Sequence, residues 1–309
     1  MKFDSTYEHC PKFSRAIGAA TDVRRGQSIC DGLRWLDRSK PPSGSEDPAQ
    51  LELLSSTDPI FSVRFMTTDP TGPLTLTYYG HCAFQWRTEA GLKVLADPYR
   101  NITGRYWFQR LFPNVECDLG LIAHAHFDHD ASERLPEGAS LIRMPGDFSN
   151  LDMNIRGVQD LHSGASRLRN FPNVMFRLET GGISFLHIGD NRVDWPTDVT
   201  QAIGDVDVLL VTVDDSNHLL NYGEVDSLIE RLEPKIVIPM HYQIPGLMAD
   251  DTGLKPPEGW LATRANVKRL DGSDAELSPK GLPSKTEVWL FQPSPVSFKS
   301  PQVEPVTPR

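Results

Sequence analysis

The chain has 309 residues, of which 39% are hydrophobic and 23% are charged, a composition typical of a globular protein with a large apolar core. Its formal net charge of −10 argues against nucleic-acid binding as a main task, because an acidic surface repels phosphate. No run reaches the roughly 18 consecutive apolar residues of a membrane-spanning helix, and the first residues lack the apolar core of a signal peptide, so we expect a cytoplasmic protein.

The two ends of the chain lack a core pattern. Residues 1–72 have weak periodicity and a stretch rich in Pro, Ser and Gly, which predicts an N-terminal extension with a linker and some helix around 28–38 and 49–55. Residues 293–309 are rich in proline and predict an extended tail that is disordered or lies on the surface. The main domain is therefore expected to span 73–292.

This central region carries a series of short apolar or alternating runs that predict strands. The expected strands are 74–80, 91–98, 118–125, 140–144, 173–179, 182–189, 207–213, 235–241 and 287–292, with a further candidate at 155–161. The segment 223–235 predicts a helix that stops before Pro234, because its apolar residues recur at helical spacing. Hairpins together with strand–helix units indicate an α/β or α+β fold with two sheets covered by helices.

A run dense in histidine follows one of these strands. LIAHAHFDHD, residues 121–130, contains three of the nine histidines of the chain. Its pattern H-x-H-x-D-H offers three imidazoles and a carboxylate, a set that suits zinc, manganese or iron; the donors are His124, His126, Asp128 and His129. In an extended segment the first two histidines would point the same way, and the last two donors would follow a bend. The pattern predicts a metal site at a strand end, where a rigid scaffold presents functional groups.

The remaining donor candidates also follow predicted strands. His162 comes after the 155–161 candidate, Asp190 lies at the end of 182–189, and His241 ends 235–241. A carboxylate such as Asp190 has two oxygens and can bridge two ions. Five histidines and two aspartates therefore predict a site for two divalent metal ions, with zinc favoured and manganese or iron as alternatives.

Several of these pieces resemble the metallo-beta-lactamase superfamily in type and order: HAHFDH (124–129), His162, Asp190 in HIGD and His241 in PMHY. Two further stretches resemble the branch that contains L-ascorbate-6-phosphate lactonase and N-acylphosphatidylethanolamine-hydrolysing phospholipase D: YYGHCAF (78–84) and VLADPY (94–99). The resemblance covers about 73–245. It implies an αββα sandwich, in which two mixed sheets face each other, helices lie outside and metals bind at one edge.

The resemblance also implies how the ligands are shared. His124, His126 and His162 would hold the first metal. Asp128, His129 and His241 would hold the second. Asp190 would bridge the two ions, and His187, three residues before it, competes with His162 for its role.

Two neighbouring divalent ions share a hydroxide at neutral pH, which predicts metal-dependent hydrolysis of a small ester, lactone or phosphodiester. Asp128 is expected to orient the nucleophile or take its proton. His218 is a second catalytic candidate, with helix capping or a solvated position as its alternative. Three residues are candidates for contacts with ligands or substrate: His81, Asp97 and Tyr242.

An aromatic cluster follows Asp97 and is a candidate wall of the substrate pocket, although ordinary packing is the simpler interpretation; its members are Tyr99, Tyr106, Trp107 and Phe108. The four cysteines form no paired motif and are expected to be free thiols.

Other functions are compatible with parts of this pattern. A nuclease of the same superfamily is disfavoured by the acidic charge and by the lack of a basic, aromatic-laced appendage. A mononuclear iron oxidoreductase resembling a persulfide dioxygenase is a further alternative, as is a non-enzymatic scaffold. We expect a small-molecule substrate, soluble metabolites before phospholipids, no nucleic acid and no membrane span. Homo-oligomerisation, the exact substrate and the metal are left open by the sequence.

Overall fold

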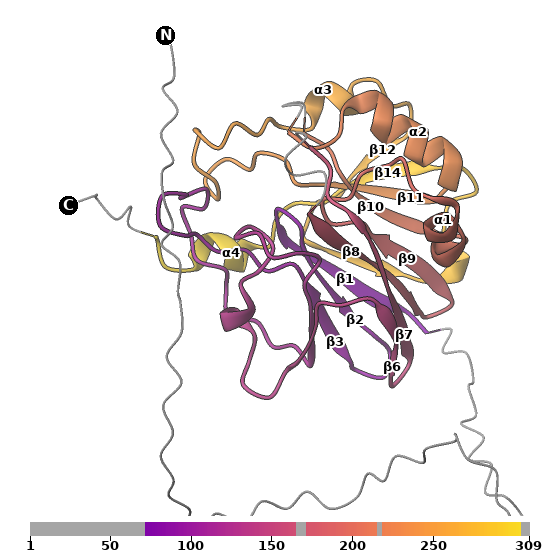
Figure 1. Cartoon of the computed structure of the whole chain (residues 1–309), viewed down its shortest axis with the longest axis horizontal. Helices are drawn as coiled ribbons and strands as arrows, with labels where there is room; N and C mark the ends of the chain where they lie inside the picture. The colour runs from indigo at the N-terminus through magenta and orange to yellow at the C-terminus, as the bar shows by residue number, and fades with distance from the viewer. Residues whose placement is uncertain (1–71, 165–170, 215–217, 304–309) are drawn as a thin grey trace, which may run out of the picture. The chain divides into compact units, whose positions relative to one another are not determined.

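Two mixed β-sheets make up most of the computed structural model, which describes residues 72–164, 171–214 and 218–303 (Figure 1). In order across the first sheet, the strands are β13 (Asp274–Leu277), β1 (Leu74–Gly80), β2 (Ala83–Arg87), β3 (Lys93–Ala96), β4 (Leu119–Leu121) and β5 (Ser140–Ile142). Across the second sheet they are β12 (Val267–Arg269), β14 (Glu287–Leu290), β11 (Ile236–Met240), β10 (Val208–Thr212), β9 (Ile183–His187), β8 (Pro172–Thr180), β7 (Met153–Leu161) and β6 (Gly146–Asn150).

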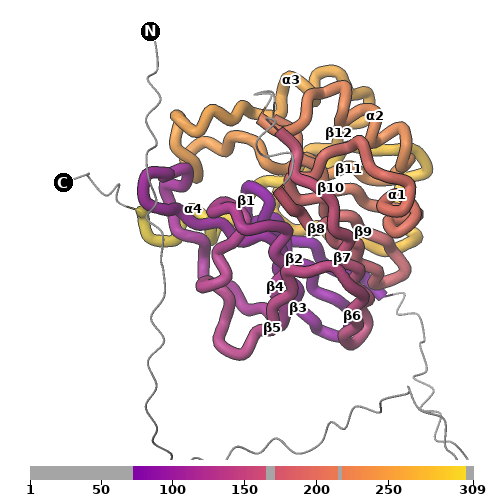
Figure 2. The backbone as a smooth tube through the Cα atoms, viewed as in Figure 1, coloured from indigo at the N-terminus to yellow at the C-terminus, as the bar shows by residue number. Residues whose placement is uncertain are grey.

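Each sheet has a parallel and an antiparallel half. In the first sheet, β13, β1, β2 and β3 are antiparallel neighbours, whereas β4 and β5 continue from β3 in parallel (Figure 2). In the second sheet, β12, β14, β11, β10 and β9 are parallel, and β8, β7 and β6 are antiparallel. The carboxyl ends of parallel strands meet at one edge of a sheet, which is where α/β proteins place their sites.

The helices are few and short. Helices α1 (Thr197–Ile203), α2 (Tyr222–Leu232) and α3 (Glu258–Leu261) lie on the side of the second sheet (Figure 1). Helix α4 (Pro295–Lys299) packs beside β1 of the first sheet. The predicted fold class, two facing mixed sheets with helices outside, is confirmed. None of the described helices combines the length and apolar composition needed to cross a membrane.

The core lies between the two sheets. Trp86 of β2 meets Phe185 of β9 with ring centroids 6.0 Å apart, so side chains of the two sheets interdigitate. The sequence of β1 explains why one face of its sheet enters the core. The apolar side chains of β1 are buried, while Thr75 and Thr77 between them are only half-buried. Strands β10 and β11 are buried along their whole length, as expected for parallel strands covered on both faces.

Helix α2 begins and ends where local chemistry requires. Asn221 caps it, since its side chain accepts from Glu224 N at 3.0 Å while Glu224 Oε2 accepts from Asn221 N at 2.8 Å. Val225 and Leu228 are buried, and the left-handed Glu233 ends the helix ahead of Pro234. The helix thus runs over Tyr222–Leu232, close to the predicted 223–235.

The histidine run has the bend that was expected before Asp128 and His129, but the segment with His124 and His126 is not extended as predicted. Strand β4 ends at Leu121, and the following residues form bends and a turn in which His129 N and Asp130 N donate to His126 O at 3.0 and 2.9 Å. A turn brings donors that are close in sequence to one small volume, which an extended strand cannot do. Strands β2, β6, β12 and β13 were also not predicted as strands.

The described residues 294–303 differ from the extended tail that the composition of 293–309 predicted. They form α4, whose Ser297 is fully buried and donates to Tyr79 O at 2.8 Å. Ser300 likewise donates to Leu111 O at 2.5 Å. Hydroxyl groups that satisfy backbone carbonyls allow this polar segment to pack on the domain. The helices predicted around 28–38 and 49–55 lie outside the described residues.

Candidate metal centre

The predicted donors gather at one edge of the two sheets. His81 lies in the β1–β2 turn, and the other donors follow strand ends: Asp97 after β3, the run 124–129 after β4, His162 after β7, Asp190 after β9 and His241 after β11. Distant parts of the chain therefore meet at this edge. The structure arranges them in two adjoining groups, whose ligand atoms lie within 4.8 Å of one another in each group.

The first donor group consists of His124, His126, His162 and Asp190. His162 Nε2 lies 3.3 Å from Asp190 Oδ2, and His124 Nε2 lies 3.7 Å from the same oxygen. His124 Nε2 is also 3.0 Å from His126 Nδ1. All but the half-buried His126 are buried, so the group opens toward solvent on the His126 side.

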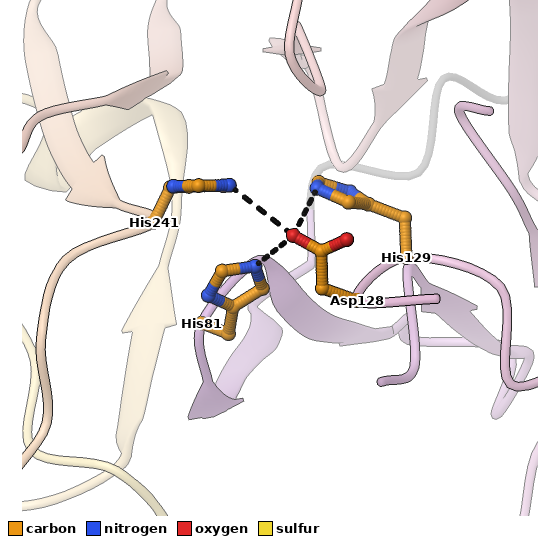
Figure 3. Close-up of side chains that lie close together, drawn as sticks. All are labelled: His81, Asp128, His129 and His241. Atoms are coloured by element: carbon orange, nitrogen blue, oxygen red, sulfur yellow. Dashed lines mark hydrogen bonds and ion pairs between the residues drawn. The ribbon is translucent and has the colours of Figure 1, made fainter. Parts of the chain in front are cut away.

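The second donor group consists of His81, Asp128, His129 and His241, all of them buried. Its side chains surround one carboxylate oxygen, Asp128 Oδ2 (Figure 3). This oxygen lies 3.2 Å from His81 Nε2, 3.7 Å from His129 Nε2 and 3.5 Å from His241 Nε2. The sequence placed His81 near the metals only as a contact for ligands or substrate, and the structure brings it into the group itself.

Asp190 joins the two groups. Its Oδ1 lies 3.2 Å from His129 Nε2, while its Oδ2 lies 3.5 Å from His241 Nε2 and contacts the first group as well. A carboxylate that contacts histidines of both groups has the position that a bridging ligand needs.

Polar groups behind the imidazoles orient two of them, and a third imidazole faces a carboxylate at a longer distance. His129 Nδ1 lies 2.8 Å from Asp97 Oδ2, and Asp97 Oδ1 accepts from Ala123 N at 2.8 Å. His162 Nδ1 bonds to the carbonyl of Ser163, and His241 Nδ1 faces Asp214 Oδ2 at 3.7 Å. A partner that holds the proton on Nδ1 turns the lone pair of Nε2 toward a metal.

The two groups differ in electrostatics. Burial holds the pKa of His124 well below its ordinary value and lowers the pKa of His126 as well. Burial also acts on His129, but the carboxylates of Asp190, Asp97 and Asp128 raise the pKa of His129 to about 10. Buried carboxylates thus demand positive charge in the second group, where either a proton or a cation can supply it.

Unpaired buried atoms test whether the donors fit a metal. The Nε2 atoms of His129, His162 and His241 are among the buried atoms that have no hydrogen-bond partner within the described part of the chain, and so is Asp190 Oδ1. Buried polar atoms without partners are rare. Imidazole and carboxylate donors that face one another in this way match the ligand chemistry of zinc and related divalent ions.

Two of the predicted residues lie differently from the ligands. Tyr242 packs on Tyr78 in the core, with ring centroids 6.4 Å apart, and it belongs to neither donor group. His218 is exposed, and its ring centroid lies 6.0 Å from that of His241, so it borders the second group from the outside.

The candidate aromatic wall divides into two parts. Tyr99 and Phe108 stack on each other with centroids 4.0 Å apart in the buried core. Trp107 is only partly buried, and its ring lies 6.4 Å from the ring of His241 and 5.2 Å from that of Phe127. Trp107 therefore borders the second donor group.

Sequence reasoning missed two residues that the fold brings to the site. Asp214 follows β10 as Asp190 follows β9, so its position at a strand end was the signal that could have found it. Cys82 is a buried free thiol whose Sγ lies within 4.8 Å of donor atoms of His129 and Asp190. Its place directly after His81 in YYGHCAF was the signal that could have found it, and Cys117 has no such neighbour.

Comparison with known proteins agrees with this geometry. The family model described as the beta-lactamase superfamily domain matches residues 75–241, more than half of the chain. The chain belongs to the metallo-beta-lactamase superfamily. The match includes every predicted metal donor from the histidine run to His241.

Members of this superfamily are similar to the chain over most of their own length. A UPF0173 metal-dependent hydrolase of Thermococcus kodakarensis is 28% identical over 225 residues, which cover 65% of this chain and 93% of that protein. One of Salinibacter ruber is 29% identical over 208 residues, or 55% of this chain and 84% of the relative. A solved structure from Thermotoga maritima, named as a Zn-dependent hydrolase of the superfamily, has a TM-score of 0.54 at 26% identity and covers 71% of this chain and 100% of its own.

Proposed function

We propose that this protein is a metal-dependent hydrolase that uses two divalent ions to cleave a small ester, lactone or phosphodiester. The observation that carries the proposal is the meeting of six histidines and two aspartates in two adjoining donor groups that are joined by Asp190. Membership of a superfamily whose relatives are named metal-dependent hydrolases supports it. The finer resemblance to the lactonase and phospholipase D branch motivates the substrate classes and stays a prediction.

The ligand assignment follows the two groups. His124, His126 and His162 would hold the first ion. Asp128, His129 and His241 would hold the second, and Asp190 lies beside both groups. When bound, such ions make water a competent nucleophile near neutral pH and stabilise the negative charge that develops on the substrate. The nitrogen-rich set favours zinc, with manganese or iron as alternatives.

Asp128 is the residue that we assign to orient the attacking water. Burial opposes its ionisation, but His129, His241 and His81 hold the pKa of Asp128 well below its ordinary value. An ionised carboxylate accepts a hydrogen bond from water, whereas a carboxylate with so low a pKa is a weak base. Asp128 therefore acts by orientation.

The position of Trp107 supports the proposal of a small substrate that has an apolar part. Its partly exposed indole borders the second donor group beside Phe127, so it offers an apolar face next to the reacting centre. The net charge of −10 disfavours a nucleic-acid substrate.

A substrate panel of lactones, phosphodiesters, phosphomonoesters and amides, run with added zinc or manganese, tests the proposal. The variant His126→Ala should lose more than about a hundredfold in kcat/KM, beyond the 10–100-fold cost typical of a residue behind a ligand. Arg156→Ala is the matched control, because Arg156 forms an exposed ion pair with Asp147 away from both donor groups.

Two results would contradict this function. One is full turnover by His126→Ala. The other is a single iron in protein purified without added metal, which would favour a mononuclear iron oxidoreductase. The Arg156→Ala variant should keep wild-type activity in either case.

A further inference from the structure

His81 differs from the other two histidines that surround Asp128 Oδ2. His129 Nε2 and His241 Nε2 also lie 3.2 and 3.5 Å from Asp190, which joins the two groups, whereas among the described residues Asp128 is the only carboxylate that pairs with His81. The Nδ1 atom of His81 is buried and has no hydrogen-bond partner in the part of the chain that the structure describes, as is also true of His241 Nδ1. His81 therefore approaches one carboxylate of the site and lacks a partner that would fix a proton on Nδ1 and leave Nε2 free for a metal.

The remaining tautomer explains the contact with Asp128. A neutral imidazole carries one N–H, and with the proton on Nε2 it faces a carboxylate oxygen at 3.2 Å, a hydrogen-bonding distance. The opposite tautomer would set two lone pairs against each other. We propose that His81 is a positioning residue, which donates from Nε2 to Asp128 Oδ2 and does not bind the second metal. The inference rests on the proposed function of the two donor groups.

The backbone holds His81 in one place. His81 has a φ of 56°, in the left-handed region that non-glycine residues rarely adopt. Its carbonyl accepts from Tyr78 Oη at 3.1 Å and from His241 N at 3.1 Å. The preceding Gly80 has a φ of 105°, and a Cβ there would lie 2.5 Å from the side chain of Leu247. A rare conformation that several contacts enforce points to a functional requirement.

Aromatic rings fix the imidazole itself. The rings of Phe108 and Trp107 stand edge-on to His81, with centroids 5.4 and 6.3 Å away. The side chain is fully buried, so it cannot turn toward solvent. A fixed donor holds Asp128 in one orientation, and if His81 is not a ligand, the second ion keeps a coordination position for water or substrate, as catalytic sites require.

Glutamine and leucine at position 81 test the proposal. His81→Gln keeps an N–H donor but is a poor metal ligand, so it should bind two ions and keep kcat within about tenfold of wild type. His81→Leu should also bind two ions but lose about 10–100-fold in kcat with little change in KM. Titration with Co²⁺, followed by visible absorption, measures the number of ions and their ligand environment without a substrate. His129→Gln is the matched control and should lose one ion.

Each alternative has its own result. Loss of one Co²⁺ in both His81→Gln and His81→Leu would show that His81 is a ligand and overturn the proposal. Wild-type kcat in His81→Leu would overturn the positioning role. A wild-type protein that binds two Co²⁺ but hydrolyses no compound would contradict the proposed function instead, and the Co²⁺ spectra of His81→Gln and His129→Gln would still decide whether His81 binds metal.

Discussion

At the scale of single residues, the atoms behind each imidazole decide what it can do. The sequence left open whether His162 or His187 is a ligand of the first metal, and the surroundings of the two side chains distinguish them. His187 Nε2 contacts Cys82 O at 2.9 Å and its Nδ1 accepts from Gly189 N at 3.3 Å, so the backbone uses both nitrogens. His162 bonds to the backbone only through Nδ1 and turns Nε2 toward Asp190. The fold thus makes His187 a core residue and leaves His162 available to a metal.

The pKa of His129 predicts that metal uptake depends on pH. Asp190, Asp97 and Asp128 outweigh burial and raise this pKa to about 10, so the metal-free protein carries a proton on His129 at pH 7. Asp190 and Asp128 also outweigh burial and raise the pKa of His241 well above its ordinary value. A metal must displace the protons on these histidines, and affinity should therefore rise by about tenfold per pH unit for each proton displaced. Calorimetric titration with zinc in buffers of different ionisation enthalpy measures the protons released.

Asp97→Asn is the variant that isolates this effect. It removes a carboxylate that raises the pKa of His129, so fewer protons should be released on binding at the same pH. Equal apparent enthalpies in all buffers for the wild-type protein would show that His129 is already neutral and contradict the prediction.

At the scale of elements, three strands of the second sheet hold the loop that carries Asp190. Asn173 of β8 is fully buried; its Nδ2 donates to Ile188 O at 2.9 Å and its Oδ1 accepts from Asp190 N at 3.3 Å. Asn191 links the same loop to Asp160 of β7 at 2.8 Å. Side-chain bonds between strands fix the loop after β9, where the backbone ladder has ended.

Loss of Asn173 should therefore weaken both stability and metal binding. Asn173→Ala leaves buried backbone groups without partners, each at a cost of about 1–3 kcal/mol, and a unit of this size loses roughly 2–4 °C in Tm per kcal/mol. Because Asp190 contacts both donor groups, zinc affinity should fall for both ions. Thermal unfolding and zinc titration measure these effects. Ser149→Ala is the control, since Ser149 lies on the exposed edge strand β6 and its hydroxyl donates to Asn154 of β7. Unchanged zinc affinity of Asn173→Ala for both ions would show that Asn173 does not support metal binding.

At the scale of the whole domain, the metal centre lies where the two sheets meet. The first sheet contributes the histidine run after β4 and His81 between β1 and β2, and the second contributes His162, Asp190 and His241. Ions bound here would connect the two layers, and metal should stabilise the domain as any ligand of the folded state does.

Chelation is expected to lower the Tm of the protein. At a metal concentration a thousand times Kd, the stabilisation amounts to about 4 kcal/mol per site. Thermal scans with EDTA, and again after zinc is restored, measure it. The variant His129→Gln should show a smaller metal-dependent shift, because it lacks one ligand of the second ion. A Tm that neither EDTA nor zinc changes would argue against a metal between the sheets.

Local patterns were enough to predict much of this molecule. Alternating apolar residues predicted β1, and the helical spacing after Asn221 predicted α2, because both depend on neighbours within a few positions. The histidine run, together with donors at later strand ends, predicted which residues gather at the site. Composition failed for 293–303, since hydroxyl groups of Ser297 and Ser300 bury a segment that looks like a tail.

Tertiary structure decided the roles within that set. Asp97 meets His129 across 32 positions of sequence, His81 meets Asp128 across 47, and Asp214 reaches His241 only because β10 and β11 are parallel neighbours. Tyr242 follows a ligand directly, yet it packs against Tyr78 in the core. Residue type determines which atoms can bind a metal, whereas the direction of each lone pair depends on partners that come close only when both sheets have formed.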